Sequence, residues 1–225
     1  MSHFRPAVAA AVVIATMIGT GVFTSLGFQL MDIQSAPVLI VLWVVGGLSA
    51  LCGALSYAEL GAALSKSGGE YHFLTEIYHP CAGFISGWVS ATVGFAAPTA
   101  LAALTLGSYL AASGLSVNPT WVATVAIVLL TTAHCTSHRH SGGTQTIFTL
   151  LKLILILGFS AAALLLGSTE HQADFTWTSE SEALLGSGAF AVSLIYVNYA
   201  YSGWNAATYI SGELASPQKT LPWVL

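Results

Sequence analysis

One lysine of this chain stands in the middle of an apolar run, where a charged side chain is costly unless it has a partner. Lys152 lies in IFTLLKLILILGF, residues 147–159. An ammonium group inside a bilayer costs roughly 3 kcal/mol on insertion scales, so such groups usually mark functional sites. Two interpretations are open: the ammonium binds a partner inside the protein, or the side chain snorkels toward the nearer, cytoplasmic end of its helix.

A second group of reactive side chains lies in HCTSHRH, residues 134–140, and four of them are metal-ligating types: His134, Cys135, His138 and His140. Their spacing matches no defined zinc pattern, so we expect a cytoplasmic loop and no metal site. We find no nucleophile paired with a base, which predicts no catalytic residues, no cofactor and no enzyme activity. Glu59 and Glu213 stand near helix ends, where we expect structural or conformational contacts.

The composition places these side chains in a membrane protein. Of the 225 residues, 55% are hydrophobic and 6% are charged, whereas soluble domains carry about 25% charged residues. Five Lys and Arg against nine Asp and Glu leave a formal net charge of -4, which excludes a basic nucleic-acid-binding surface. The three cysteines are scattered and predict no disulfide framework.

Six apolar runs are long enough to cross a bilayer as helices, which takes roughly 20 residues each. We expect an all-α membrane protein with a single transmembrane domain over residues 1–225. Its spans are predicted at about 7–30, 36–64, 82–112, 119–136, 144–167 and 184–212. Pro98 falls inside the third span and should kink it.

The few charged residues orient these spans with the N-terminus in the cytoplasm, in the plasma (inner) membrane. Four of the five cations then lie on the cytoplasmic side: Arg5, Lys66, Arg139 and Lys219. The opposite side carries only acids: Asp32, Glu170, Asp174, Glu180 and Glu182. The reversed topology would violate the positive-inside rule.

Two of the spans carry a break near their middle. The first reads IATMIGTGVFTS, residues 14–25, with Gly19-Thr20-Gly21 at its centre, and the sixth is interrupted by Ser202-Gly203, followed by Trp204-Asn205. In lipid, backbone groups freed by a break are tolerated only where they are buried or line a cavity. The half-helix after a break offers N–H groups to a carboxylate, and the carbonyls before it can accept from an ammonium.

Glycines that serve packing alone have a different spacing elsewhere in the chain. Small residues four apart form such stripes on the second and third spans: Gly46, Ala50, Ala54, Ala58 and Ala62, then Gly83 and Gly87. Gly19 and Gly21 are two apart and face different directions, although packing remains the alternative for them. Paired breaks in the first and sixth spans are typical of transporters built from inverted repeats, which predicts a substrate site at the breaks.

Four stretches of the chain resemble one membrane family. They are MIGTGVF at 17–23, SKSGGEYHFL at 65–74, TQTIFTLLKL at 144–153 and YAYSGWNAATYISGELASPQKTLP at 199–222. On these motifs the chain resembles the amino acid–polyamine–organocation superfamily, most closely the L-type amino acid transporters and bacterial amino acid permeases. The resemblance implies a LeuT-like inverted-repeat fold with helices 1 and 6 discontinuous. This chain would supply the first five-helix repeat plus helix 6, the N-terminal half only.

The resemblance also implies which atoms of the first break hold an amino acid. The backbone around Thr20, Gly21 and Val22 would bind the substrate carboxylate. Carbonyl groups near Met17 and Ile18 would receive the α-ammonium.

The second break would complete the same site. By the resemblance, the carbonyls of Tyr199 and Ser202 share the ammonium, and the Tyr199 ring forms a gate over the substrate. Asn205 would hydrogen-bond either the substrate or the break itself. Without the motif, Tyr199 and Trp204 would be taken as ordinary buried aromatic residues.

Lys152 matches the family's lysine in the fifth helix, which occupies the place of a sodium ion in sodium-coupled relatives. The resemblance therefore implies sodium-independent transport. Two versions stay open: an exchanger in which the lysine remains charged, or coupling to protons.

The predicted function is thus that of an amino acid permease or antiporter for neutral amino acids, working by alternating access. Because the implied second repeat is largely absent, we also consider a truncated remnant or a non-transporting membrane subunit that needs a second membrane chain. A membrane enzyme using metal at His134 and His138 is a further alternative.

Overall fold

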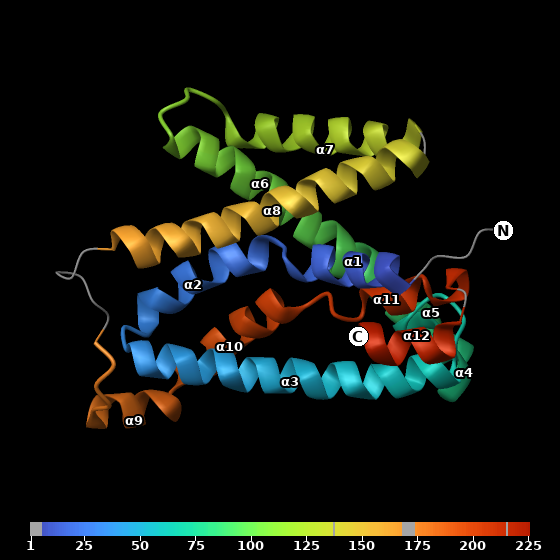
Figure 1. Cartoon of the computed structure of the whole chain (residues 1–225), viewed down its shortest axis with the longest axis horizontal. Coiled ribbons are helices and arrows are strands. Elements are labelled where there is room, and N and C mark those ends of the chain that lie inside the picture. The colour runs from blue at the N-terminus through green and yellow to red at the C-terminus, as the bar shows by residue number, and fades with distance from the viewer. Residues whose placement is uncertain (1–5, 137, 168–173, 215) are drawn as a thin grey trace. The chain divides into compact units, whose positions relative to one another are not determined.

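The computed structural model describes residues 6–136, 138–167, 174–214 and 216–225 (Figure 1). Every regular element in these ranges is a helix. Four helical stretches are long and apolar enough to cross a membrane: Pro6–Asp32, Ala36–Ala63, Pro80–Ala112 and Ile147–Leu166. A fifth is added if two helices bent by 65°, Ser179–Leu185 and Gly188–Tyr201, form one span. The expectation of an all-helical membrane protein is confirmed at this level.

The described residues divide into two compact units. The first takes in residues up to Gly69 and from Lys152 onward, and the second spans Glu70–Leu151. The first unit contains α1 (Pro6–Met17), α2 (Thr20–Asp32), α3 (Ala36–Ala63), the later part of α8 (His138–Leu166), α9 (Ser179–Leu185), α10 (Gly188–Tyr201), α11 (Ala206–Tyr209) and α12 (Pro217–Val224).

Within the first unit, α3 is the helix against which the C-terminal segments pack. Figure 1 shows α10 and α12 lying along it. Two glycines of α3 make this approach possible, Gly46 of the predicted small-residue stripe and Gly61 outside it. A Cβ at Gly46 would collide with Val197, and one at Gly61 would come within 2.9 Å of Leu221 Cδ1. Val197 and Leu221 are completely buried as a result.

Two apolar clusters form the core of this unit. One joins the start of α1 to the C-terminal segment and consists of Ala9, Val13, Ala207, Leu214 and Leu221. The other joins the loop after α2 and the start of α3 to α10 and consists of Ile33, Val38, Leu42 and Val197. The interrupted helices lie between these clusters in sequence, so both ends of each interruption are anchored by apolar packing.

The second unit contains α4 (Glu70–Ile77), α5 (Pro80–Val89), the π-helix η1 (Ser90–Ala96), α6 (Ala97–Ala112), α7 (Pro119–Thr136) and the beginning of α8. The predicted Gly83–Gly87 pair packs on α4, since a Cβ at Gly83 would collide with Thr75 and one at Gly87 would lie 3.0 Å from Tyr71 Cδ2.

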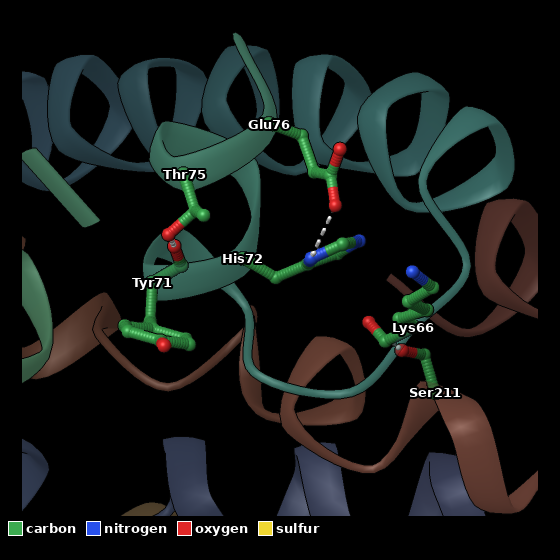
Figure 2. A network of polar contacts seen from close by, with 6 residues as sticks. All are labelled: Lys66, Tyr71, His72, Thr75, Glu76 and Ser211. Atoms are coloured by element: carbon green, nitrogen blue, oxygen red, sulfur yellow. Dashed lines mark hydrogen bonds and ion pairs between the residues drawn. The ribbon is translucent and has the colours of Figure 1, made fainter. Parts of the chain in front are cut away.

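Helix α4 was not predicted; it lies between the predicted second and third spans, 36–64 and 82–112. Figure 2 shows polar contacts made by its residues. Thr75 Oγ1 donates to the Tyr71 carbonyl at 2.7 Å, and His72 Nδ1 lies 3.9 Å from Glu76 Oε1 one turn later. His72 and Phe73 are buried. An amphipathic helix of eight residues is too short to stand out by periodicity alone.

Pro98 acts on the third span through the preceding turn. The helix continues from Pro80 to Ala112, but residues 90–96 are wound as a π-helix directly before the proline. The extra residue per turn accommodates a ring that lacks an N–H and crowds the carbonyl four residues earlier. The predicted kink therefore takes the form of a locally widened helix.

Two of the six predicted spans are not counted as single membrane-crossing helices among the described residues. The fourth, 119–136, is helical, but only Pro119–Ala133 counts as an apolar stretch, which is shorter than a full span. The sixth carries its break at residues 202–205; in addition it bends by 65° between α9 and α10, and after the break α11 is one turn long and a 3-10 turn, Ser211–Glu213, follows.

The early end of the helix after the break has a local cause. Thr208 Oγ1 donates to the Asn205 carbonyl at 2.7 Å, and Ser211 Oγ donates to the Thr208 carbonyl at 3.1 Å. Side chains of this kind compete with the backbone for the helical hydrogen bonds. The sixth span was predicted from hydropathy, which does not reflect competition between side chains and backbone for hydrogen bonds.

We predict that Gly83→Ala destabilises the protein by about 1–3 kcal/mol, the usual cost of overpacking, because the new methyl meets Thr75 and the Tyr71 backbone. Thermal unfolding in detergent measures the effect. Gly27→Ala in α2 is the matched control, since a Cβ there has nothing within 4 Å. Equal melting temperatures for the two variants would contradict the packing role of Gly83.

Candidate functional site

The first interruption lies where the sequence predicted it, in the first unit. Helix α1 ends at Met17, and α2 begins at Thr20 after Ile18 and Gly19. The Gly19 backbone is extended, and its N–H donates to the Met17 carbonyl at 2.9 Å. No side chain caps α2 at Gly19. The first N–H groups of a helix have no partner within it, so α2 presents donors beside the break.

The interruption also leaves a carbonyl of α1 without its helical donor. In a continuous helix, the Gly19 N–H would bond to Ala15, four residues earlier. Here Gly19 bonds to Met17, and Lys152 Nζ donates to the Ala15 carbonyl at 3.3 Å. Lys152 comes from α8 and is half-buried. Its ammonium thus occupies the position that the break vacates.

The second interruption lies between α10 and α11, over residues 202–205. Ser202 turns the chain, and both its N–H and its Oγ donate to the Tyr199 carbonyl, at 3.2 and 2.7 Å. Gly203 follows with a φ of +104°, in the region that favours glycine. The Tyr199 carbonyl, predicted as an ammonium acceptor, therefore already accepts two hydrogen bonds in this conformation.

The two interruptions meet each other. A Cβ at Gly21 would lie 2.8 Å from Ala200 Cα, so the backbone of α2 touches that of α10. A Cβ at Gly203 would lie 2.9 Å from Thr16 Cγ2 and 3.1 Å from the Met17 nitrogen. The start of α2 thus packs on the end of α10, and the second break packs on the end of α1. One small region brings both breaks together.

Trp204 is held in this region by α3. Its ring edge fills the space of a missing side chain, since a Cβ at Gly53 would lie 2.7 Å from Trp204 Cζ2. The Tyr57 ring meets it edge to face with centroids 4.9 Å apart. Asn205 Nδ2 donates to the Tyr209 hydroxyl at 3.2 Å, so this amide is directed along the break.

The structure describes most, but not all, of the predicted site residues in this region. Met17, Ile18 and Gly21 share the region with Ser202 of the second break. Val22, which follows Gly21, is half-buried. The backbone of Thr20 opens α2, but its side chain lies outside the described residues.

Residues 134–140, predicted as a loop, are helical in their described parts, because α7 runs to Thr136 and α8 begins at His138. Cys135 is exposed, whereas the side chains of His134, His138 and His140 lie outside the described residues. Among those that are described, no three His, Cys, Asp or Glu side chains gather in a way that could hold a metal ion. Glu59 and Glu213 are exposed.

Two polar residues of α2 were missed by sequence reasoning. Ser25 Oγ donates to the Tyr196 carbonyl of α10 at 3.0 Å, and Gln29 Oε1 accepts from Trp43 Nε1 of α3 at 2.9 Å. Both are buried, and Gln29 Nε2 has no partner in the described part of the chain. Ser25 and Gln29 lie four and eight residues after Gly21 in an apolar span, and this helical spacing was the available signal.

Comparison with known proteins shows to which family the chain belongs. The family model described as amino acid permease matches residues 7–225. The mouse large neutral amino acids transporter small subunit 2 is 30% identical over 230 residues, which cover 95% of this chain and 42% of that protein.

A second kind of amino acid transporter matches the chain as well. The human b(0,+)-type amino acid transporter 1 is 31% identical over 217 residues, and its rat counterpart is 33% identical over 223. The matched residues cover 94% and 95% of this chain but 44% and 45% of those proteins. The chain thus spans less than half the length of these relatives, and on the match over residues 7–225 it belongs to the amino acid permease family.

Proposed function

We propose that the protein acts in sodium-independent transport of neutral amino acids across the plasma (inner) membrane, with the substrate held between the two breaks. The observation that carries this proposal is the meeting of the breaks, Gly21 against Ala200 and Gly203 against Met17. Membership of the family and the names of its relatives, which are amino acid transporters, support the substrate class.

The chemistry of the region suits a zwitterion. The uncapped N–H groups at Thr20, Gly21 and Val22 would bind the carboxylate, with support from the positive end of α2. The carbonyls of Met17, Ile18 and Ser202 would accept from the ammonium. The Tyr199 carbonyl would join them only after Ser202 releases it. We keep the Tyr199 ring as the proposed gate.

The contact of Lys152 supports its proposed role in coupling. A snorkelling lysine would extend to the membrane surface, whereas Lys152 Nζ bonds to the carbonyl at the break of α1. A cation on that carbonyl does what a sodium ion would do there, which is why we infer sodium independence. The chain would be one transmembrane domain of inverted-repeat type, with its N-terminus in the cytoplasm by its charge distribution.

A second candidate is a membrane subunit that works only with another membrane chain. The name of the mouse relative, which calls that protein a small subunit, favours it. Expression of the gene's entire reading frame, followed by purification and uptake assays in proteoliposomes, separates the two candidates. A partner that co-purifies and is required for uptake would support the second candidate over the first.

Uptake of neutral amino acids by this product should be saturable and unchanged when sodium is replaced by choline. Substrate loaded inside the vesicles should stimulate an exchanger, whereas an imposed proton gradient should drive a proton-coupled carrier. Radiolabelled uptake measures both. An absolute requirement for sodium would rule out the role given to Lys152.

Lys152→Ala should reduce uptake at least about tenfold, because the Ala15 carbonyl loses its donor and an unmet buried group costs about 1–3 kcal/mol. Lys219→Ala, at an exposed lysine, is the control and should retain uptake. Protein amounts in the membrane are compared by immunoblot. Full transport by Lys152→Ala would remove the lysine from the mechanism.

Gly21→Ala should weaken substrate binding about tenfold, since the new methyl separates α2 from Ala200. Binding is measured by the shift in melting temperature that saturating amino acid produces. Gly27→Ala, six residues further along the same helix and free of neighbours, should bind normally. Normal binding by Gly21→Ala would place the substrate elsewhere.

A further inference from the structure

The turn after α3 is built around two glycines of the SKSGGEYHFL stretch. Gly68 and Gly69 have φ values of +126° and +53°, which favour glycine. Gly69 is also crowded: a Cβ there would lie 2.7 Å from Tyr209 Cε1, 2.9 Å from Tyr209 Cδ1 and 3.0 Å from Thr208 Oγ1. The backbone of this turn is therefore the surface on which the Tyr209 ring rests.

Two hydrogen bonds fasten this turn to the segment after the second break. Ser211 Oγ donates to the Lys66 carbonyl at 2.8 Å, a pair visible in Figure 2. The Gly212 N–H donates to Ser67 Oγ at 2.9 Å. The turn and the segment are thus bonded to each other next to the Gly69–Tyr209 contact, which limits the room for Tyr209 to shift.

Tyr209 in turn contacts the second break directly. Its hydroxyl accepts from Asn205 Nδ2 at 3.2 Å. Asn205 is the last residue of the break, and its carbonyl accepts from the Thr208 N–H at 2.9 Å and from Thr208 Oγ1 at 2.7 Å. The side chain and the carbonyl of Asn205 are therefore both held by residues that rest against Gly69.

We propose that Gly69 is a positioning residue for the amino acid site: through Tyr209 it sets the position of Asn205 in the second break. The inference deepens the proposed function and rests on it for the identity of the ligand. A methyl group at residue 69 pushes the Tyr209 ring away, the hydroxyl leaves Asn205, and the break loses one of the contacts that define its shape.

The first test is the kinetics of uptake by the product of the entire reading frame. Gly69→Ala and Tyr209→Phe should each raise the KM for a neutral amino acid about fivefold, as expected for one lost hydrogen bond. The maximal rate per molecule in the membrane should stay at the wild-type level. Tyr209→Phe keeps the ring on the turn, so it tests the hydroxyl even if Gly69→Ala does not fold.

Gly114→Ala separates positioning from simple backbone strain. Gly114 also has a positive φ, +93°, but a Cβ there has nothing within 4 Å. This variant should leave KM unchanged. Combining Tyr209→Phe with Asn205→Ala should give the KM of Asn205→Ala alone, because both changes remove the same contact. Wild-type KM values in Gly69→Ala and Tyr209→Phe would overturn the proposal.

A measurement that needs no substrate tests the positioning role of Gly69 separately from the proposed transport function. The side-chain amide signal of Asn205, assigned by NMR of the labelled protein in detergent, should shift in Gly69→Ala and in Tyr209→Phe but not in Gly114→Ala. If the wild type transports nothing, the proposed function fails while this signal still reports on Asn205. An unshifted signal in both variants would overturn the positioning role regardless of uptake.

Discussion

The contact between the backbones of two interrupted helices, at Gly21 and Ala200, is the constraint on which the first unit depends. Only a residue without a side chain allows this approach, because a Cβ at Gly21 would lie 2.8 Å from Ala200 Cα. The approach brings Ser25, one turn further along α2, to the Tyr196 carbonyl. It also brings Gly203 onto the end of α1. The two breaks are therefore one structural feature.

A break inside an apolar segment must find partners for the backbone groups that it frees. Here the partners are specific: Gly19 bonds to the Met17 carbonyl, Lys152 bonds to the Ala15 carbonyl, and Ser202 bonds to the Tyr199 carbonyl. Each bond gives a partner to a backbone group beside a break, which is how interrupted helices persist where water does not reach. The donors left at the start of α2 then face the region where a carboxylate could bind.

Helix α3 supplies the surface that keeps the second interrupted segment in place. Three of its glycines each face one side chain of that segment: Gly46 faces Val197, Gly53 faces Trp204 and Gly61 faces Leu221. The turn at its end continues the pattern with Gly69 and Tyr209. Of these three glycines only Gly46 belonged to the predicted small-residue stripe, and together they have defined counterparts before, within and after the break.

Local features of the sequence determined the apolar spans, the places of both breaks, and the π-helix that precedes Pro98 within a span predicted to kink there. Hydropathy, glycine and proline act within a few residues, so their effects can be read along the chain. The course of the chain after residue 205 was not readable in this way, because side-chain hydrogen bonds from Thr208 and Ser211 ended the helix there. Tertiary structure alone decided that Lys152 meets Ala15 and that Tyr209 rests on Gly69. The two residues of each pair are 137 and 140 positions apart. Local periodicity in the sequence does not show which distant backbone group a side chain will contact.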